Sequence, residues 1–125
     1  MSNINEIVER WVQVWHEADA VARRKTISEL WADDATEVTT EKEFHGQDAL
    51  FNRVTSAYEE FVGTGQYVFV SAGDVAAHHD MVVFTCQMLA AGGDEVRWRA
   101  RIVLLLNEAG QIQREDQVEL QTLSV

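Results

Sequence analysis

The chain has no proline, so its glycines are expected to form the turns. It also has only one cysteine and few positive charges. Its 125 residues include 10 lysines and arginines against 21 aspartates and glutamates, a formal net charge of -11. Such a surface repels phosphate backbones, so we expect no nucleic-acid partner. Cys86 has no second cysteine with which to form an internal disulfide, and its apolar neighbours indicate a buried structural thiol.

Long hydrophobic runs are also missing. The longest apolar run, Ile102 to Leu106, is far too short to cross a bilayer, and no basic segment with an apolar stretch opens the chain. We therefore expect no membrane partner and a cytoplasmic location. The length suits a single domain, residues 1–125, whose core needs no disulfide or metal. No set of metal ligands has a recognised spacing, so neither a metal nor a cofactor is expected.

Helical periodicity is confined to the first half of the chain. Apolar residues recur at helical spacing from Ile4 to Ala18, and Asn3 followed by Glu6 has the form of a capping box. Asp19 can cap a second helix that ends at Asp33-Asp34. Its apolar side carries Val21, Ile27, Leu30 and Trp31, and its solvated side is expected to carry Arg23, Arg24 and Lys25.

A third helix and a series of strands follow. The apolar pattern from Leu50 to Phe61 predicts a helix that stops at Gly63 with a left-handed cap. Six segments have strand patterns: Thr36–Thr40, Glu43–His45, Gln66–Ala77, Met81–Ala90, Glu95–Leu106 and Gln111–Gln121. The last four are joined by short turns, which is typical of an antiparallel meander. The fold class is therefore α+β, with the helices on one face of the sheet.

Three local motifs lie at the junctions of these segments. They are Trp31-Ala32-Asp33-Asp34-Ala35-Thr36, His45-Gly46 with Ala49-Leu50, and Asn107-Glu108-Ala109-Gly110-Gln111-Ile112. With the element order, they resemble the nuclear transport factor 2-like superfamily, including its SnoaL-like polyketide cyclases and ketosteroid isomerases. The resemblance implies a cone-shaped barrel of three helices on a strongly curved, mostly antiparallel sheet. It also implies an apolar pocket at the open end, and homodimers made through the outer sheet face.

The resemblance does not fix a function, because this superfold hosts enzymes and non-enzymes alike. The general base of ketosteroid isomerases aligns with Thr39, which cannot act as that base. Their acidic oxyanion donor aligns with Ile102, and their first-helix tyrosine aligns roughly with Trp15. These replacements argue against steroid isomerisation. The last-strand acid of limonene epoxide hydrolases and several cyclases aligns with Gln117, whose neighbour is Asp116.

Two registers are open for the last strand. Alternation places Trp98, Ala100, Ile102 and Leu104 on the inner face of the preceding strand. Matching apolar faces puts Ile112, Asp116, Val118 and Leu120 inside, whereas the family register turns Glu115, Gln117 and Glu119 inward. The family register leaves Val118 and Leu120 outside as an apolar dimer patch. A one-residue slip or a bulge interchanges the two.

We favour Asp116 inside, because exposing the aliphatic rows costs about 1.5–3 kcal/mol per side chain unless a partner covers them. Asp116 is then the leading candidate proton carrier, since burial raises the pKa of a carboxyl group towards neutrality. The alternative is a surface Asp116 paired with Arg99 or Arg101. His45 is a second candidate proton carrier, although a histidine beside such a glycine is more often a turn or capping residue.

The remaining candidate site residues are mostly large and apolar. They are expected to shape the pocket and comprise Trp15, Trp31, Tyr58, Phe84, Trp98 and Ile102, with Gln117 as a neutral hydrogen-bonding group. Aromatic residues at such spacing also simply fill cores.

Two functional hypotheses follow. The first is an enzyme that performs acid–base chemistry, of isomerase, cyclase, dehydratase or hydrolase type, on a small hydrophobic molecule. The second is a non-catalytic dimeric module that holds a small apolar ligand or a protein partner with Trp98, Tyr58 and Gln117. A dimeric interaction domain with a closed, unused cavity is the third and plainest possibility. Loss of both isomerase acids favours the binding module, and a buried Asp116 favours the enzyme.

Overall fold

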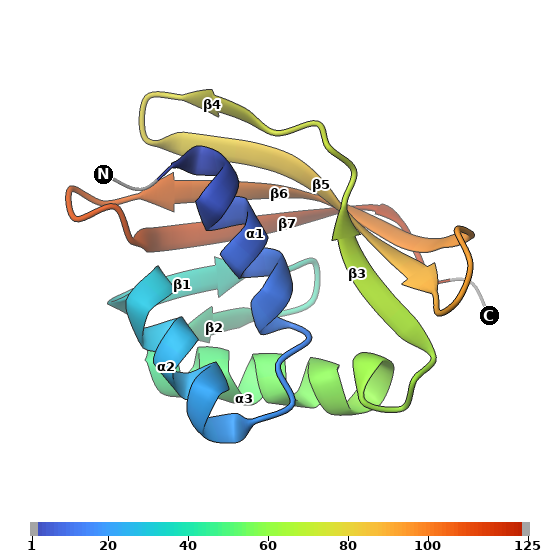
Figure 1. Ribbon diagram of the computed structural model, residues 1–125. Coiled ribbons are helices and arrows are strands. Elements are labelled where there is room, and N and C mark those ends of the chain that lie inside the picture. The colour runs from blue at the N-terminus through green and yellow to red at the C-terminus, as the bar shows by residue number, and fades with distance from the viewer. Residues whose placement is uncertain (1–2, 124–125) are drawn as a thin grey trace.

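The structure is a computed structural model that describes residues 3–123. In this part of the chain, three helices lie on one side of a seven-stranded sheet (Figure 1). The helices are α1 (Ile4–Val14), α2 (Ala20–Leu30) and α3 (Gly46–Ala57), which continues into a π-helical turn, η1 (Tyr58–Val62). The strands are β1 (Trp31–Val38), β2 (Glu43–His45), β3 (Tyr67–Ser71), β4 (Ala76–His78), β5 (Met81–Ala90), β6 (Val96–Leu106) and β7 (Ile112–Gln121).

The sheet is mixed and mostly antiparallel. Neighbouring strands run β2-β1-β7-β6-β5-β3, and β4 also pairs with β5. The β1–β7 pair is parallel and the other pairs are antiparallel. Helix α1 crosses one face of the sheet, and α3 runs below β1 and β2 (Figure 1). The predicted α+β architecture is confirmed, with Trp11, Trp31, Phe84 and Ile102 fully buried where the helices meet the sheet.

The helix starts follow the sequence closely, but their ends do not. Asn3 caps α1 by accepting a hydrogen bond from the Asn5 N–H at 2.8 Å, and Asp19 caps α2 by accepting from the Ala22 N–H at 2.9 Å. The prediction that α2 continues to Asp33-Asp34 is wrong. Trp31 already pairs with Ile112, so ladder hydrogen bonds replace helical ones from that residue onward.

The polarity predicted for α2 is also wrong at two positions. Arg23 is only 3% exposed, whereas Val21 is 79% exposed. The Arg23 guanidinium donates to the main-chain oxygen of Glu17 at 2.8 Å and to Oγ1 of Thr55 at 2.8 Å, and it lies 5.2 Å from the Tyr58 ring centroid. The buried cation therefore ties the α1–α2 loop to α3 instead of facing solvent.

Gly63 ends the third helical segment, although not as a left-handed cap. Its φ angle is −63°, and its N–H donates to the Tyr58 carbonyl at 2.6 Å across a wide π-type turn. The strand predicted over Gln66–Ala77 is likewise interrupted between β3 and β4. There the Asp74 carboxylate accepts hydrogen bonds from both the N–H and Oγ1 of Thr85, so a side chain replaces part of the ladder.

The last strand contains a bulge that decides which side chains face inward. Leu106 pairs with Ile112 but Leu105 pairs with Arg114, so β7 holds one extra residue, Gln113, between them. The bulge keeps Ile112 buried and also turns Glu115 and Gln117 inward. The register that placed Asp116 inside is therefore wrong, because simple alternation cannot account for the extra residue.

Candidate functional site

A cavity of about 300 Å³ lies where η1, β3, β5, β6, β7 and the turn after β1 converge. Its apolar walls include Phe61, Phe69, Met88 and Trp98, and its polar lining includes Arg53, Gln117, Glu41 and Glu119. Met88 and Gln117 are buried and Glu41 and Glu119 are exposed. The buried end of the cavity is therefore formed in part by Gln117, and its outer rim carries two acids.

Helix α3 presents Arg53 to this cavity, and Glu37 on β1 holds it there. Nε of Arg53 donates to Oε1 of Glu37 at 2.7 Å, and Nη2 donates to the side-chain oxygen of Gln117 at 3.4 Å. The Glu37 side chain is fully buried, whereas that of Arg53 is 27% exposed. The guanidinium also lies 5.5 Å from the Trp15 ring and 5.1 Å from the Phe44 ring. Arg53 is thus fixed by both charge and stacking.

Behind Gln117 lies a second acid, Glu115, which is also fully buried. Its Oε1 accepts from the Trp11 indole N–H at 2.7 Å, and its Oε2 accepts from the Gln117 amide at 2.8 Å. Burial and then the neighbouring Glu37 carboxylate raise the pKa of Glu115 well above its usual value. The hydrogen bonds from Gln117 and Trp11 oppose that increase. Burial and the neighbouring carboxylate outweigh these hydrogen bonds, so the neutral form of Glu115 persists to higher pH than that of a free glutamate.

These side chains form one continuous polar cluster through the core. Its members, in order of contact, are Trp11, Glu115, Gln117, Arg53 and Glu37. Only Arg53 and Gln117 of the five line the cavity. With Glu115 protonated, the cluster carries one positive and one negative charge. It can therefore offer hydrogen-bond donors to a ligand without placing a net charge beneath it.

The structure brings two of the sequence-predicted pocket residues to this cavity. Gln117 lines its buried end, and Trp98 forms part of its wall. The Trp98 indole N–H donates to Oε2 of Glu119 at 2.9 Å, which fixes the ring at the rim. The inward Gln117 follows the register implied by the family resemblance rather than the one that we favoured.

Asp116 does not reach the cavity. It lies on the outer face of β7, where Arg114 donates to its two carboxylate oxygens at 2.8 and 3.0 Å. Its partner is Arg114 rather than the Arg99 or Arg101 that the sequence suggested. The assignment of Asp116 as an inward proton carrier is therefore corrected, because the bulge at Gln113 turns it towards solvent.

His45 is also not among the residues that line the cavity. It precedes α3 without making a side-chain cap, and 67% of its side chain is exposed. Nδ1 lies 3.2 Å from Oγ1 of Thr36, and Nε2 lies 3.4 Å from a Glu43 carboxylate oxygen. The structure thus places His45 at the end of β2, in the N-cap position of α3.

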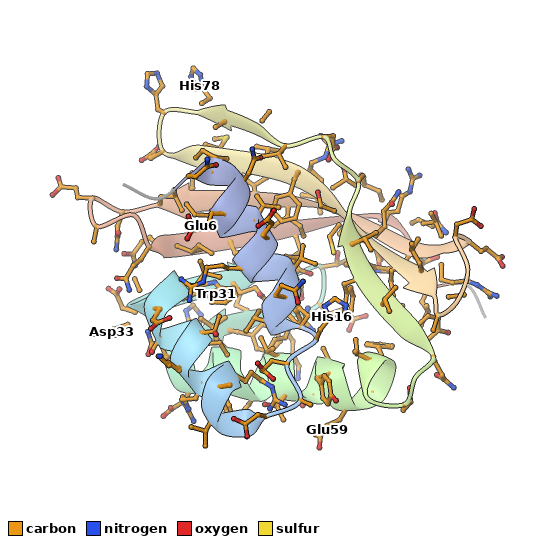
Figure 2. All side chains as sticks on the ribbon, viewed as in Figure 1. Glu6, His16, Trp31, Asp33, Glu59 and His78 are labelled. Atoms are coloured by element: carbon orange, nitrogen blue, oxygen red, sulfur yellow. The ribbon has the colours of Figure 1, made fainter. Side chains whose placement is uncertain are left out.

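The other candidate pocket residues lie outside the residues that line the cavity. Trp15, Trp31, Phe84 and Ile102 are buried in the core, and Tyr58 packs against Arg23. Figure 2 shows Trp31 near the junction of α2 and β1, within the body of the molecule. His78 lies at the outer tip of the β4–β5 hairpin and points away from the sheet (Figure 2). Cys86 is fully buried, as its surroundings indicated.

Glu37 and Arg53 were not found from the sequence. Arg53 lies three residues after Leu50 and next to Val54, so helical spacing already places it beside the buried face of α3. Glu37 alternates with Ala35 and Thr39, which would have placed an acid on the inner face of the first strand. Both spacings are visible in the sequence, but neither shows that Glu37 and Arg53 pair with each other.

Residues 3–123 contain neither a metal-binding cluster nor a membrane-spanning helix. No group of three or more histidine, cysteine, aspartate or glutamate side chains in this range is arranged to hold a metal ion. No helix in the same range has the length and apolar character needed to cross a membrane.

Comparison with known proteins places the fold. No protein-family model matches the sequence, and no curated protein matches it significantly. Among similar solved structures is a proposed isomerase of the SnoaL-like family from Agrobacterium tumefaciens, with 24% identity and a TM-score of 0.83 over 95% of this chain and 98% of that one. A proposed polyketide cyclase from Sinorhizobium meliloti has 14% identity and a TM-score of 0.67 over 90% and 93% of the two chains.

A third similar structure is a nuclear transport factor 2-like protein of unknown function from an Exiguobacterium species. It has 20% identity and a TM-score of 0.69, covering 93% of this chain and 99% of that one. The protein therefore has the cone fold of the nuclear transport factor 2-like superfamily, as the sequence motifs predicted. At these identities the likeness concerns the fold, and function must be argued from the cavity itself.

Proposed function

We propose that this protein binds a small, largely apolar and uncharged molecule in the cavity, with a hydrogen-bond-accepting group of that molecule against Arg53. The observation that carries the proposal is the position of one fixed guanidinium among aromatic walls. Apolar clefts of a few hundred Å³ with a small number of convergent polar groups are typical of small-molecule sites. The cavity of about 300 Å³ has this composition.

Arg53 has further N–H groups that can donate hydrogen bonds to such a ligand. A guanidinium carries five N–H donors, and the hydrogen bonds to described residues occupy Nε and Nη2. A carbonyl, ether or hydroxyl oxygen at the buried end could accept from the remaining N–H groups. Phe61, Phe69 and Trp98 would then surround the apolar part of the ligand.

Charge argues for an uncharged ligand rather than an anion. Glu41 and Glu119 lie at the rim, and the Arg53 charge is already balanced by Glu37. The whole chain carries a formal charge of -11, so its field repels anions on approach. A neutral molecule with one acceptor group meets none of these penalties.

The first prediction tests binding with 2-acetonaphthone, a flat neutral ketone. We expect saturable binding, and Trp98→Ala is expected to weaken it about tenfold because one aromatic wall is removed. Isothermal titration calorimetry measures the affinity, and 2-naphthoate is the anionic counterpart, expected to bind more weakly. Asp116→Ala, on the outer face, serves as the control and should bind like the wild type. Absence of binding, or equal affinity in the Trp98→Ala variant, would contradict the proposal.

Acid–base catalysis is the second candidate, and the same guanidinium favours it. N–H donors aimed at a carbonyl oxygen stabilise the negative charge that develops there when a neighbouring C–H bond loses its proton. An isomerase, cyclase, dehydratase or hydrolase acting on a hydrophobic substrate could use Arg53 in this way. Exchange of the ketone's methyl protons with D₂O, followed by NMR, tests it: catalysed exchange supports an enzyme, and exchange at the buffer rate supports a binding module.

We also propose that the protein forms a homodimer through the outer face of its sheet. Val118 and Leu120 are 52% and 46% exposed on adjacent outward positions of β7. Arg101, the pairing partner of Val118, and Asp116 bring opposite charges to the same face, which suits a self-complementary contact between two copies. An apolar row of this kind is commonly covered by a partner.

The second prediction is therefore that Val118→Asp converts a dimer into a monomer. Burying an uncompensated carboxylate at an interface between copies is strongly unfavourable. Light scattering coupled to size exclusion measures the mass. Val21→Asp is the matched control, since Val21 is 79% exposed on α2 and far from the sheet face in sequence and fold. A wild-type protein that elutes as a monomer would rule out the dimer.

A further inference from the structure

The two buried acids behind the cavity, Glu37 and Glu115, form a pair in which neither acid lines the cavity. They come from adjacent strands, because β1 and β7 run parallel and these two residues are Cα partners in the ladder. Both are fully buried. Residues opposite each other in a ladder point to the same side of the sheet, so the two carboxyl groups are neighbours in the core.

The hydrogen bonds around the pair lack one donor. Oε1 of Glu37 accepts from Arg53, but Oε2 of Glu37 is buried without a hydrogen-bond partner among the described residues. Both oxygens of Glu115 accept, from Trp11 and from Gln117. A buried polar atom without a partner is costly. A protonated carboxyl group donates one hydrogen bond and still accepts others, so a proton on Glu115 would supply the missing donor.

The charges in the cluster also favour one proton on this pair of acids. Two ionised carboxylates beside one guanidinium would leave a net negative charge in the core, and closely spaced buried carboxylates do not both ionise readily. The groups that face Glu115 are Trp11 from α1, Glu37 from β1, Gln117 from β7 and Cys86 from β5. Burial raises the pKa of the Cys86 thiol, so that group stays neutral.

We infer that Glu37 and Glu115 share a single proton, donated by the Glu115 carboxyl group to Oε2 of Glu37, and that this pair is a proton-binding site that sets the charge beneath the ligand cavity. While the proton is bound, the cluster with Arg53 is neutral. When the proton leaves, the cluster carries one negative charge, and Arg53 and Gln117 face two carboxylates. The pair holds this proton whether or not the cavity binds a ligand.

The test is a pH titration of the ligand-free protein with ¹³C-labelled glutamate side chains, followed by NMR of the carboxyl carbons. We expect one glutamate to titrate far above the others and to be lost in Glu115→Gln. In the wild type, the Glu37 carbon should shift at the same pH, because the proton that leaves Glu115 is the one donated to Oε2 of Glu37. In Glu37→Gln, the Glu115 midpoint should fall by at least about one pH unit, a tenfold change in proton affinity.

Exposed Glu108 provides the matched control, since Glu108→Gln should leave the high midpoint unchanged. Three outcomes would overturn the inference. They are the absence of a high-titrating glutamate, a Glu37 carbon that ignores the Glu115 titration, and an unchanged Glu115 midpoint in Glu37→Gln. The second of these is measured on the wild-type protein, so the test stands even if the Glu37 variant does not fold.

Discussion

Replacing Arg53 with methionine is expected to lower the free energy of unfolding by about 3–5 kcal/mol near neutral pH, the usual cost of removing one partner of a buried ion pair. The reason is Glu37, which is fully buried and relies on Arg53 as its charged partner at 2.7 Å. Methionine keeps much of the apolar stem that packs near Trp15, so the loss reflects mainly the charge.

Urea denaturation measures this effect, and a second substitution separates charge from packing. Arg53→Met combined with Glu37→Gln should recover much of the lost stability, because the uncompensated carboxylate is gone. Arg24→Met is the matched control: Arg24 pairs with Asp48 at 2.7 Å, but both side chains are largely exposed. That surface pair should contribute no more than about 1 kcal/mol. If the double variant were as unstable as the single one, the charge explanation would fail.

Replacing Glu115 with glutamine is expected to stabilise the protein progressively as the pH rises above about 4.5, the ordinary pKa of a glutamate. The pKa of Glu115 is raised in the folded protein, first by burial and then by Glu37. Above pH 4.5 the unfolded chain loses this proton while the folded chain keeps it. The unfolded state then binds fewer protons, so wild-type stability falls with increasing pH until the folded group also titrates.

Glutamine has no proton to lose, so its advantage over the wild type should grow by up to about 1.4 kcal/mol per pH unit within that window. The amide also keeps an acceptor for Trp11 and gains an N–H for Oε2 of Glu37. Thermal and urea unfolding from acidic to mildly alkaline pH measure the difference. Glu108→Gln should show no such trend, and parallel pH curves for Glu115→Gln and the wild type would disprove the elevated pKa.

Local signals were enough to predict most of the fold. The caps at Asn3 and Asp19, the strand patterns in the second half and the three junction motifs all depend on residues close in sequence. The errors arose where distant residues decide the outcome. Trp31 leaves the helix because β7 pairs with it, and Arg23 is buried because Thr55 and the α1–α2 loop provide acceptors.

The candidate site was harder to predict for the same reason. Gln117 and Trp98 were identified, but Asp116 was preferred over Gln117 because an apolar strand face is normally the buried one. That rule fails here, since Glu115 and Gln117 find partners in Trp11 and Arg53 that lie 104 and 64 positions away in sequence. Burial of polar side chains is acceptable once such partners exist, and no pattern within one strand reveals them.

The extra residue in β7 gives a single backbone position control over the chemistry of the inner wall. In a regular ladder that kept the present length of the strand, every side chain after Gln113 would exchange sides. Arg114, Asp116 and Val118 would then face the helices, and Glu115 and Gln117 would face the solvent. Deleting Gln113 itself would instead leave Arg114 outward and Glu115 inward, so the polar lining would survive the loss of the bulge.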